Sequence, residues 1–583
     1  MAGAPNAMPS SLQVSLGQYS DKGRKAVNQD FHGALIPEGM ALISKGLVLA
    51  LADGIGSSNV SHIASETAVS SFLEDYFSTP ETWSVRQSAQ RVINATNAWL
   101  HAQTRQSQYR YDLDRGYVCT FTALVIKGDS AHCFHLGDAR LYRLSNGVLE
   151  QLTEDHRLWV SREQSYLSRA LGMNARAEID HLSMPVTEGD WFVLATDGVH
   201  EYLDTDTLTS TLASQTDPRQ AARTLAALAY ERGSEDNLTV QVLRVDRLPR
   251  DESSALSGRL DDLPLPPELH ARMEFDGFRI LRELHASSRS HVYLAEDLDS
   301  GVTVVLKTPA IDRADDRAFL ERFMMEEWIA HRIDHPHVLK APPRQRQRRY
   351  LYTVTDYVEG ETLTQWMRDH PNPSLETVRD LVEQIARALY AFHRREILHQ
   401  DLRPENVMVD ANGTITLIDF GAARVAGLAE LAPPRDREAP QGTLPYMAPE
   451  YFLGEPGNTA SDLFSLGVIA YQLLTGDLPY GTAVSQCRTR SAQNRLRYRS
   501  ALRDDRDLPA WVDGALRKAV HPHPDKRYRE LSEFIHDLRH PGPGLAHPIR
   551  PPLMERHPVR FWQSVSAVLA LLVVLLAVRL YGA

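Results

Sequence analysis

The stretch 399–424 reads HQDLRPENVMVDANGTITLIDFGAAR and gathers residue types that suit phosphoryl transfer. Two short β-forming runs, Val407–Val409 and Ile415–Ile418, are joined at Asn412-Gly413, a dipeptide typical of hairpin turns. The polar residues that flank this hairpin are Asp401, Arg403, Asn406 and Asp419. Two carboxylates and an amide held by one hairpin suit a site that grips a magnesium-bound triphosphate and orients a hydroxyl group.

The spacing HxDLxPxN followed by Asp-Phe-Gly resembles the catalytic and metal-binding loops of the eukaryotic-like serine/threonine protein kinases. The resemblance implies that Asp401 is the base for the substrate hydroxyl and that Arg403 replaces the lysine that usually contacts the transferring phosphate. It also implies that Asn406 and Asp419 bind Mg²⁺ in the presence of ATP. We therefore predict a kinase domain over 273–540.

Further stretches complete the kinase pattern, namely GTLPYMAPE, SDLFSLGV and the residue Arg527. In this family, Glu450 and Arg527 are expected to form a buried structural pair. Asp462 is expected to hold the backbone of the catalytic loop. These three residues are predicted to serve the framework and not the chemistry.

The start of this domain, FRILRELHASSRSHVYLAEDLDSGVTVVLKTP, predicts three strands, the third closed by Lys307. By the same resemblance, Lys307 lies on the ATP phosphates and pairs with a glutamate of the helix predicted over 317–332. The matching position is Glu326, and Glu327 is the alternative if the register slips by one residue.

The loop that covers the ATP phosphates departs from the family pattern. Three glycines are expected there, since their backbone amides approach the phosphates, but the chain has His285, Ser287 and Ser290. Serine hydroxyls can donate to phosphate, yet we expect a stiffer loop and weaker ATP binding. Asp356 and Val358 belong to the segment that joins the two lobes, where the adenine is expected.

Residues 12–246 show a different construction, in which aspartates stand at the ends of apolar β-forming runs. Four positions share this construction: Asp53, Asp138, Asp197 and Asp236. Strands that end in Asp-Gly bring carboxylates to the rim of a sheet, where glycine permits close approach of a ligand. Several carboxylates at one rim repel each other unless cations neutralise them. The pattern therefore indicates a site for divalent cations.

The order of these motifs, from RKAVNQD and LADGIG to GSEDNLTV, resembles the metal-dependent serine/threonine protein phosphatases (the PPM, or type 2C, family). The resemblance implies a β-sandwich flanked by helices, with candidate helices at 61–76, 85–103 and 220–232. It also implies that Asp53 bridges two Mn²⁺ or Mg²⁺ ions and activates the water between them. The other implied metal ligands are the Gly54 carbonyl, Asp197, Asp236 and, for a weaker third ion, Asp138.

Three residues depart from the phosphatase pattern. Gln29 stands where many members have an acidic ligand, so we expect a weaker second metal, with Asp30 compensating through water. Lys25 stands where an arginine usually grips the substrate phosphate, with Arg24 beside it; a lysine binds as a point charge without the bidentate fork. Ile55 stands where eukaryotic members carry a histidine.

Bulk properties agree with several globular domains. The chain has 583 residues, 24% charged and 43% hydrophobic, which is too long for a single core. Its net charge of -12 disfavours nucleic acid as a partner. Three cysteines lie far apart without the spacing of metal ligands, which favours a reducing compartment.

The remaining segments are expected to connect or anchor these domains. We predict a disordered N-terminus over 1–11, a linker over 247–272 and a proline-rich tether over 541–560. Residues 561–578 carry no charge and are apolar on every side from Ala567, and the helix 561–581 is predicted to cross the cell inner membrane once, with both domains cytoplasmic. The alternative is a C-terminal helix buried on the kinase domain.

The fold class expected from the sequence is multidomain α+β: a phosphatase-like β-sandwich, a bilobal kinase fold and one C-terminal transmembrane helix. The expected function is a membrane-anchored enzyme that phosphorylates and dephosphorylates protein Ser/Thr. The alternative is an active phosphatase governed by a nucleotide-binding pseudokinase that transfers no phosphate. A third interpretation makes the kinase half a scaffold for partners. The sequence does not indicate an oligomeric state.

Overall fold

The computed structural model describes residues 12–581 apart from these stretches: 113–114, 160–164, 250–262, 288, 314–315, 344–345, 432–443, 503–506, 543–544 and 546–557. The predicted N-terminus 1–11, half of the predicted linker and most of the predicted tether therefore lie outside the described residues. The chain forms two compact units. The first comprises 1–357, 391–399 and 419–439, and the second comprises 358–390, 400–418 and 440–583.

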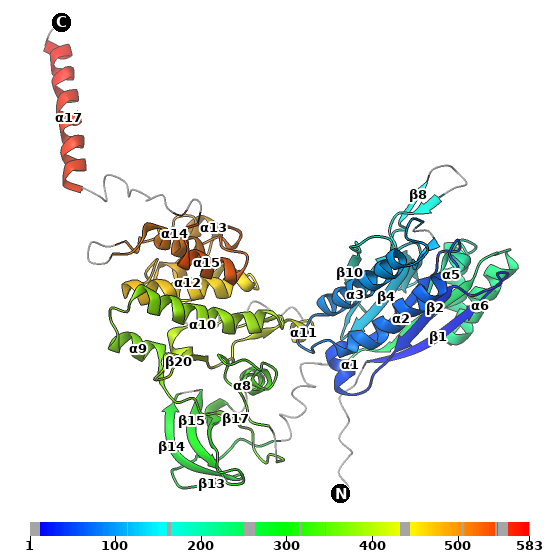
Figure 1. Cartoon of the computed structure of the whole chain (residues 1–583), viewed down its shortest axis with the longest axis horizontal. Helices are drawn as coiled ribbons and strands as arrows, with labels where there is room; N and C mark the ends of the chain where they lie inside the picture. The colour runs from blue at the N-terminus through cyan, green and yellow to red at the C-terminus, as the bar shows by residue number, and fades with distance from the viewer. Residues whose placement is uncertain are drawn as a thin grey trace. The chain divides into compact units, whose positions relative to one another are not determined.

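Two five-stranded antiparallel sheets dominate the N-terminal part of the first unit (Figure 1). One has the order β1 (Gln13–Asp21), β12 (Leu238–Arg247), β11 (Trp191–Ala195), β6 (Arg140–Ser145) and β7 (Val148–Gln151). The other has the order β10 (Asp180–Pro185), β5 (Ser130–Leu136), β4 (Phe121–Lys127), β3 (Leu47–Asp53) and β2 (Asp30–Leu35). Buried apolar residues of both sheets form one cluster, so the predicted β-sandwich is confirmed.

Helices cover both sheets of this sandwich. Helices α2 (Ser61–Ser78) and α3 (Val85–Gln106) pack on the β2–β5 side, and α6 (Pro218–Glu231) packs on β1 and β12. Helix α3 begins after Ser84, whose hydroxyl accepts a hydrogen bond from Gln87 N, and Pro218 opens α6. Shorter elements complete this part: α1 (Met40–Lys45), α4 (Asp197–His200), α5 (Thr205–Ser214), β8 (Arg157–Trp159) and β9 (Ser165–Leu167).

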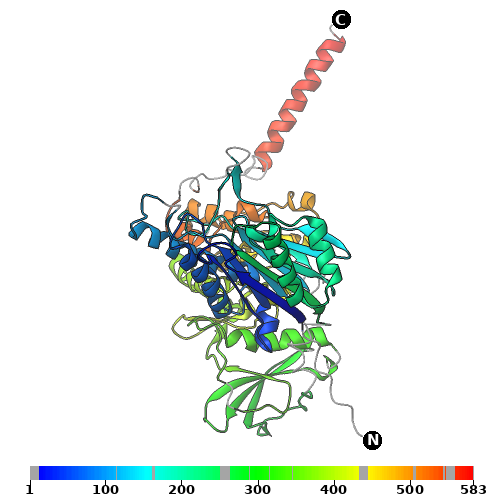
Figure 2. The same cartoon turned by 90° about the vertical axis from the view of Figure 1, so that its right-hand side faces the viewer.

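The first unit also contains a third five-stranded sheet, drawn in green at the lower end of Figure 2. Its strand order is β13 (Glu274–Phe275), β14 (Phe278–Ala286), β15 (Ser290–Asp297), β16 (Thr303–Pro309) and β17 (Thr353–Asp356). The predicted three strands correspond to β14–β16. Two more strands, β13 and β17, flank them, and the short β13 carries too few residues to show a pattern. The predicted helix is present as α8 (Arg317–Ala330).

Three short elements complete the first unit. Strand β19 (Ile397–Leu398) pairs with β22 (Arg424–Val425), and α11 (Ala426–Ala429) follows directly. Strand β22 comes five residues after Asp419, so the pair connects the segment before His399 with the segment after the Asp-Phe-Gly motif.

The second unit is mainly helical. Its strands are β18 (Glu361–Thr362), β20 (Val407–Val409) and β21 (Ile415–Leu417), and β20 and β21 form the predicted hairpin across Asn412-Gly413. Its helices are α9 (Leu363–Asp369), α10 (Leu375–His393, whose last three residues belong to the first unit), α12 (Thr459–Thr475), α13 (Arg490–Gln493), α14 (Ala510–Ala519) and α15 (Leu531–Arg539).

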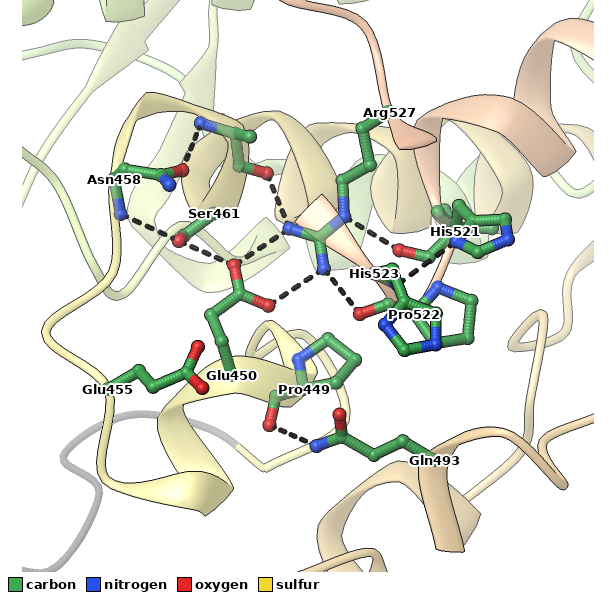
Figure 3. A network of polar contacts seen from close by, with 12 residues as sticks. Pro449, Glu450, Glu455, Asn458, Ser461, Gln493, His521, Pro522, His523 and Arg527 are labelled. Carbon is green, nitrogen blue, oxygen red and sulfur yellow. Dashed lines mark hydrogen bonds and ion pairs between the residues drawn. The ribbon is translucent and has the colours of Figure 1, made fainter. Parts of the chain in front are cut away.

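A buried ion pair between Glu450 and Arg527 holds this unit together (Figure 3). The two carboxylate oxygens of Glu450 accept from the Arg527 guanidinium at 2.8 and 2.7 Å, and the Ser461 hydroxyl donates to Glu450 at 2.6 Å. The guanidinium also donates to three backbone carbonyls, those of Ala460, His521 and Pro522. Every polar atom of the pair is thus satisfied, which confirms the predicted structural pair.

The C-terminal helix α17 (Pro558–Tyr581), drawn in red in Figures 1 and 2, coincides with the predicted 561–581 segment. Among the residues that the structure describes, however, no helix meets the length and apolarity that a bilayer span requires. The first turns of α17 carry the polar Gln563, Ser564 and Ser566, which shorten its apolar part. The transmembrane prediction is therefore not supported by the structure.

Candidate active sites

The predicted metal-binding aspartates of the N-terminal domain stand at the ends of adjoining strands. Asp30 begins β2 and Asp53 ends β3, and the antiparallel register pairs these two residues directly. Cross-strand partners share a face of the sheet, so both carboxyl groups lie at one rim. Asp197 opens α4 just after β11, and Asp138 follows β5.

The electrostatics show that these carboxylates crowd each other. Burial, followed by repulsion from Asp30, Asp197 and Asp138, raises the pKa of Asp53 well above its usual value. Burial raises the pKa of Asp30 to about 6. Burial and the charges of Asp138, Asp236 and Glu201 raise the pKa of Asp197 to about 7. Carboxylates held this way fit a site that is built to receive cations.

Gly54 has to be glycine for this rim to form. A Cβ at this position would lie 2.8 Å from Ser61 and 2.9 Å from the Gln29 carbonyl oxygen, which is too close. Gln29, which replaces an acidic ligand, donates from Nε2 to the Ser58 carbonyl at 2.8 Å and to the Ser61 hydroxyl at 2.7 Å. Its amide therefore serves the loop before α2.

An open cavity of about 590 Å³ adjoins the carboxylates. Its lining comprises Arg24, Lys25, Asp197, Gly198, Glu201, Tyr202, Glu235 and Asp236. Lys25 Nζ lies 3.1 Å from Asp236 Oδ2, and both side chains are partly exposed. The Arg24 guanidinium donates to the Ser234 carbonyl at 2.7 Å and stacks over the Tyr230 ring. Of these two basic residues, Lys25 therefore lies beside the carboxylates, while Arg24 holds the end of α6.

In the kinase-like part of the first unit, Lys307 on β16 pairs with Glu326 on α8. Lys307 Nζ lies 2.6 Å from Glu326 Oε2 and 3.7 Å from Asp419 Oδ1. Although burial opposes the positive charge, Glu326 and Asp419 raise the pKa of Lys307 above its usual value. Glu327 instead pairs with Arg348, so the structure selects Glu326 over Glu327 as the partner of Lys307.

Asp419 is held in a left-handed backbone conformation, with φ of 62°. Its carboxylate accepts from Gly421 N at 3.3 Å, which is a local contact that fixes the turn. The next residue, Phe420, is fully buried and packs edge-to-face on Phe392. A non-glycine residue in this conformation is uncommon and persists where the surroundings enforce it.

The glycine-free loop is closed by its own serine. The Ser287 hydroxyl accepts from Ser290 N at 3.1 Å and from Arg289 N at 3.3 Å, and donates to the Ser290 carbonyl at 3.0 Å. These backbone amides are therefore already engaged, and a phosphate has to compete for them. The expectation of a stiffer loop is consistent with this arrangement.

In the second unit, the catalytic-loop residues are arranged around Asn406. Its amide donates to the Asp401 carbonyl oxygen at 2.9 Å and approaches Asp401 Oδ2 at 3.4 Å. Arg403 Nε lies 3.9 Å from Asp401 Oδ2. Asp462 accepts from Gln400 N at 3.0 Å, which confirms its expected hold on the loop backbone.

Models of two protein families match the chain, one over the N-terminal sandwich and one over the C-terminal half. The model described as protein kinase domain matches residues 278–540, and the model described as protein phosphatase 2C matches residues 18–231. The chain contains a protein kinase domain and a protein phosphatase 2C domain. Both are enzyme domains, and they fit the predicted use of Mg²⁺ with ATP and of Mn²⁺ or Mg²⁺.

Individual relatives match one domain at a time. The serine/threonine-protein kinase PrkC of Bacillus subtilis (strain 168) is 29% identical over 267 residues, which are 45% of this chain and 40% of that protein. PknA of Corynebacterium glutamicum is 32% identical over 33% of this chain and 41% of its own length. The chain thus spans about 40% of these curated relatives.

Among solved structures, the chain is similar in part to PppA of Pseudomonas aeruginosa, which is described as a key regulatory component of T6SS. It is 25% identical, with a TM-score of 0.34, and the match covers 41% of this chain and 99% of that one.

One residue of the phosphatase domain escaped the sequence reasoning. Arg157, on β8, lies 2.5 Å from Asp138 Oδ2 and 3.0 Å from Asp197 Oδ2, and it also pairs with Glu201. It directly follows His156, but no feature of the sequence indicates that its side chain reaches carboxylates up to 44 positions away.

Arg157 and Lys25 change how the carboxylates are held. Within the described residues, no three His, Cys, Asp or Glu side chains converge closely enough for a ready-made metal site. Asp138 and Asp197 turn toward Arg157, and Asp236 turns toward Lys25. The donor set of buried, repelling carboxylates fits Mn²⁺ or Mg²⁺, and protein cations neutralise part of it.

Proposed function

We propose that the chain is a bifunctional enzyme that phosphorylates protein Ser/Thr with ATP and hydrolyses phosphoserine and phosphothreonine. The observation that carries the proposal is the presence of two matched enzyme domains, each with the polar residues that its chemistry requires. For the phosphatase these are the crowded carboxylates, and for the kinase the Lys307–Glu326 pair together with Asp401, Asn406 and Asp419.

In the phosphatase domain, Asp53, Asp197 and Asp236 would hold two Mn²⁺ or Mg²⁺ ions with the Gly54 carbonyl. Asp30 and Asp138 would support them, and bound metal would supply an acidified water as the nucleophile. Lys25, beside the cavity, binds oxygens of the substrate phosphate and offsets their negative charge. The open cavity leaves room for a phosphorylated peptide segment.

In the kinase domain, Lys307 binds ATP phosphate oxygens while Glu326 fixes its position. Asn406 and Asp419 would hold Mg²⁺, and the bound ion would supply positive charge to neutralise the charge that develops on the phosphates. Asp401 accepts the proton of the attacking Ser or Thr hydroxyl, and Arg403 contacts the transferring phosphate. Ser287, Ser290, Asp356 and Val358 would complete the nucleotide site.

A second candidate function is favoured by the Ser287 contacts. Because its hydroxyl occupies the amides of Arg289 and Ser290, the domain is also suited to hold nucleotide weakly and transfer nothing. In that case the kinase domain would regulate the phosphatase as a pseudokinase.

The test uses the full-length protein and two variants, Asp53→Asn and Asp419→Asn. With Mg·ATP and a generic protein substrate, we expect transfer by the wild type and by Asp53→Asn but not by Asp419→Asn. With an aryl phosphate and Mn²⁺, we expect hydrolysis by the wild type and by Asp419→Asn. The rate of Asp53→Asn should fall by at least about 10³-fold if Asp53 bridges the two metal ions. Hydrolysis that persists in EDTA would remove the phosphatase assignment, and nucleotide binding without transfer would establish the pseudokinase.

We also propose that the chain is anchored at the cell inner membrane by its C-terminal helix, with both domains cytoplasmic. The apolar run of 561–578 supports this proposal, as do the arginines that precede it at 550, 556 and 560. The full-length protein should stay in the membrane fraction through a carbonate wash. Its release by carbonate would overturn the proposal.

A further inference from the structure

Lys127, the last residue of β4 in the phosphatase domain, is buried against the kinase segment that follows Asp419. Its side chain is 1% exposed, and Nζ donates to the Gly427 carbonyl at 2.6 Å and to Glu430 Oε2 at 3.1 Å. All these residues belong to the first compact unit. Burial of an ammonium group is costly in free energy unless good partners compensate it. The two acceptors, the Gly427 carbonyl and Glu430, provide this compensation, so the contact is specific.

Two kinase carboxylates meet the N-terminus of α3. Ser84 donates to Glu396 Oε2 from its backbone N at 2.7 Å and from its hydroxyl at 2.8 Å. Val85 N donates to both carboxylate oxygens of Glu430, at 3.0 and 3.1 Å. The first amides of a helix lack internal partners and favour negative charge, so Glu396 and Glu430 supply what this helix end requires.

The loop between α2 and α3, residues 79–84, also contacts the kinase backbone closely; we call it the docking loop. Gly427 N donates to the Thr82 carbonyl at 3.0 Å, and Trp83 Nε1 donates to the Arg394 carbonyl at 3.0 Å. A Cβ on Gly427 would lie 2.7 Å from the carbonyl oxygens of Glu81 and Trp83. No side chain fits at position 427, so the two backbones match each other in shape.

The docking loop contacts the two kinase elements whose placement governs activity. Glu430 and Gly427 lie in the segment after Asp419, while Arg332, just beyond α8, pairs with Glu81 at 2.8 Å. Helix α8 carries Glu326, which pairs with Lys307. A kinase requires both this pair and the Asp-Phe-Gly aspartate in place.

The kinase domain lacks the groups for the usual phosphate switch in this segment. Gln400 stands where many kinases carry an arginine before the catalytic aspartate, so a charge-assisted partner for a phosphate is missing. Between Gly421 and Gly442 the sequence contains no Ser, Thr or Tyr. The segment therefore requires a different group to order it.

We propose that the phosphatase domain is this ordering partner: the docking loop and Lys127 bind the segment 424–430 and the end of α8, and so hold the kinase domain in its active arrangement. The inference rests on the proposed kinase activity. It assigns the phosphatase domain a second role, as an activator of the kinase in the same chain, that is independent of phosphate hydrolysis.

The contact is tested first by amide hydrogen exchange on the full-length protein. The amides of Ser84, Val85 and Gly427 donate across the contact, so peptides that contain them should exchange slowly in the wild type. Glu396→Gln and Lys127→Met should accelerate exchange in peptides on both sides. Glu66→Gln, on an exposed glutamate of α2, is the matched control and should leave exchange unchanged. Fast exchange at all three amides in the wild type would overturn the proposal.

The activating role is tested on the same variants. Phosphate transfer from Mg·ATP should fall by about 5- to 150-fold, the usual range of coupling between sites, while hydrolysis of an aryl phosphate stays at the wild-type rate. Faster exchange with unchanged or higher transfer would overturn the activating role. If the wild type transfers no phosphate, the kinase assignment fails and the activating role with it, whereas slow exchange would still establish the contact. Loss of both activities in Lys127→Met would indicate that this variant misfolds. The rate of phosphate transfer by Glu396→Gln then decides whether the activating role holds.

Discussion

Replacing Asp197 by asparagine should stabilise the metal-free phosphatase domain while abolishing its activity. Burial and three neighbouring carboxylates raise the pKa of Asp197 to about 7 from an ordinary value of 3.8. A carboxyl group with a raised pKa binds its proton more tightly in the folded state. Its contribution therefore destabilises the fold progressively as the pH rises from about 4 to about 7, and fully above that range.

The magnitude follows from this difference. At about 1.4 kcal/mol for each tenfold change in proton affinity, the raised pKa corresponds to about 4 kcal/mol at pH 8. A quarter of the side chain is exposed (25%), and Arg157 offsets part of the repulsion, so we expect a gain of about 1–3 kcal/mol in Asp197→Asn. Asparagine has the same shape and keeps an oxygen for Arg157, so packing changes little.

The assay is calorimetry of the full-length protein in EDTA at pH 8 and at pH 5. The unfolding transition that Mn²⁺ shifts in the wild type identifies the phosphatase domain, since ligands stabilise the state that binds them. In the variant this transition should move to a higher temperature at pH 8, move less at pH 5, and no longer respond fully to Mn²⁺. An unchanged or lower transition temperature at pH 8 would refute the view that the carboxylates repel each other.

Three further predictions follow from single contacts. Ser287→Gly should lower the KM for ATP several-fold, because the amide of Ser290 is freed for phosphate; a higher KM in steady-state assays would contradict this. Glu450→Gln should cost about 3–5 kcal/mol of unfolding free energy, since Arg527 keeps a buried charge without its carboxylate. Moreover, Arg527 helps to hold the pKa of Glu450 below its usual value despite burial. The ion pair therefore stabilises the wild type above a pH of about 4.3, and this stabilisation is lost on acidification. Wild-type denaturation curves that coincide at pH 7 and pH 3 would exclude it. Lys307→Met should abolish phosphate transfer and leave aryl phosphate hydrolysis unchanged; equal loss of both rates would indicate unfolding instead.

Much of the fold was predictable because the signals are local. The strand ends at Asp53 and Asp197, the helix that begins after Ser84, and the hairpin at Asn412-Gly413 follow from turn residues, caps and apolar runs within a few positions. The choice between Glu326 and Glu327 was not local. It depends on the rotation of α8 relative to β16, which a single sequence leaves open.

The interactions that escaped prediction are long-range or lie on short elements. Strands β8 and β9 have three residues each, too few for a period, yet β8 places Arg157 among the carboxylates. The apolar run at the C-terminus predicted a membrane span that the described residues do not support. The role of Lys127 could not be predicted from the sequence, because its partners lie about 300 positions away.

Both sites hold a protein cation among carboxylates before any ligand binds. Lys307 lies between Glu326 and Asp419, and Arg157 lies between Asp138 and Asp197. In each case the cation offsets repulsion that would otherwise destabilise the folded domain. In the proposed kinase function the same cation, Lys307, also binds the ATP phosphates, so ligand binding would add to an existing arrangement. In the phosphatase domain, a divalent ion that bound at Asp138 and Asp197, as proposed, would have to displace Arg157 from them, so part of its binding free energy would be used to break these ion pairs. The affinity of this metal position should therefore depend on Arg157 as well as on the carboxylates themselves.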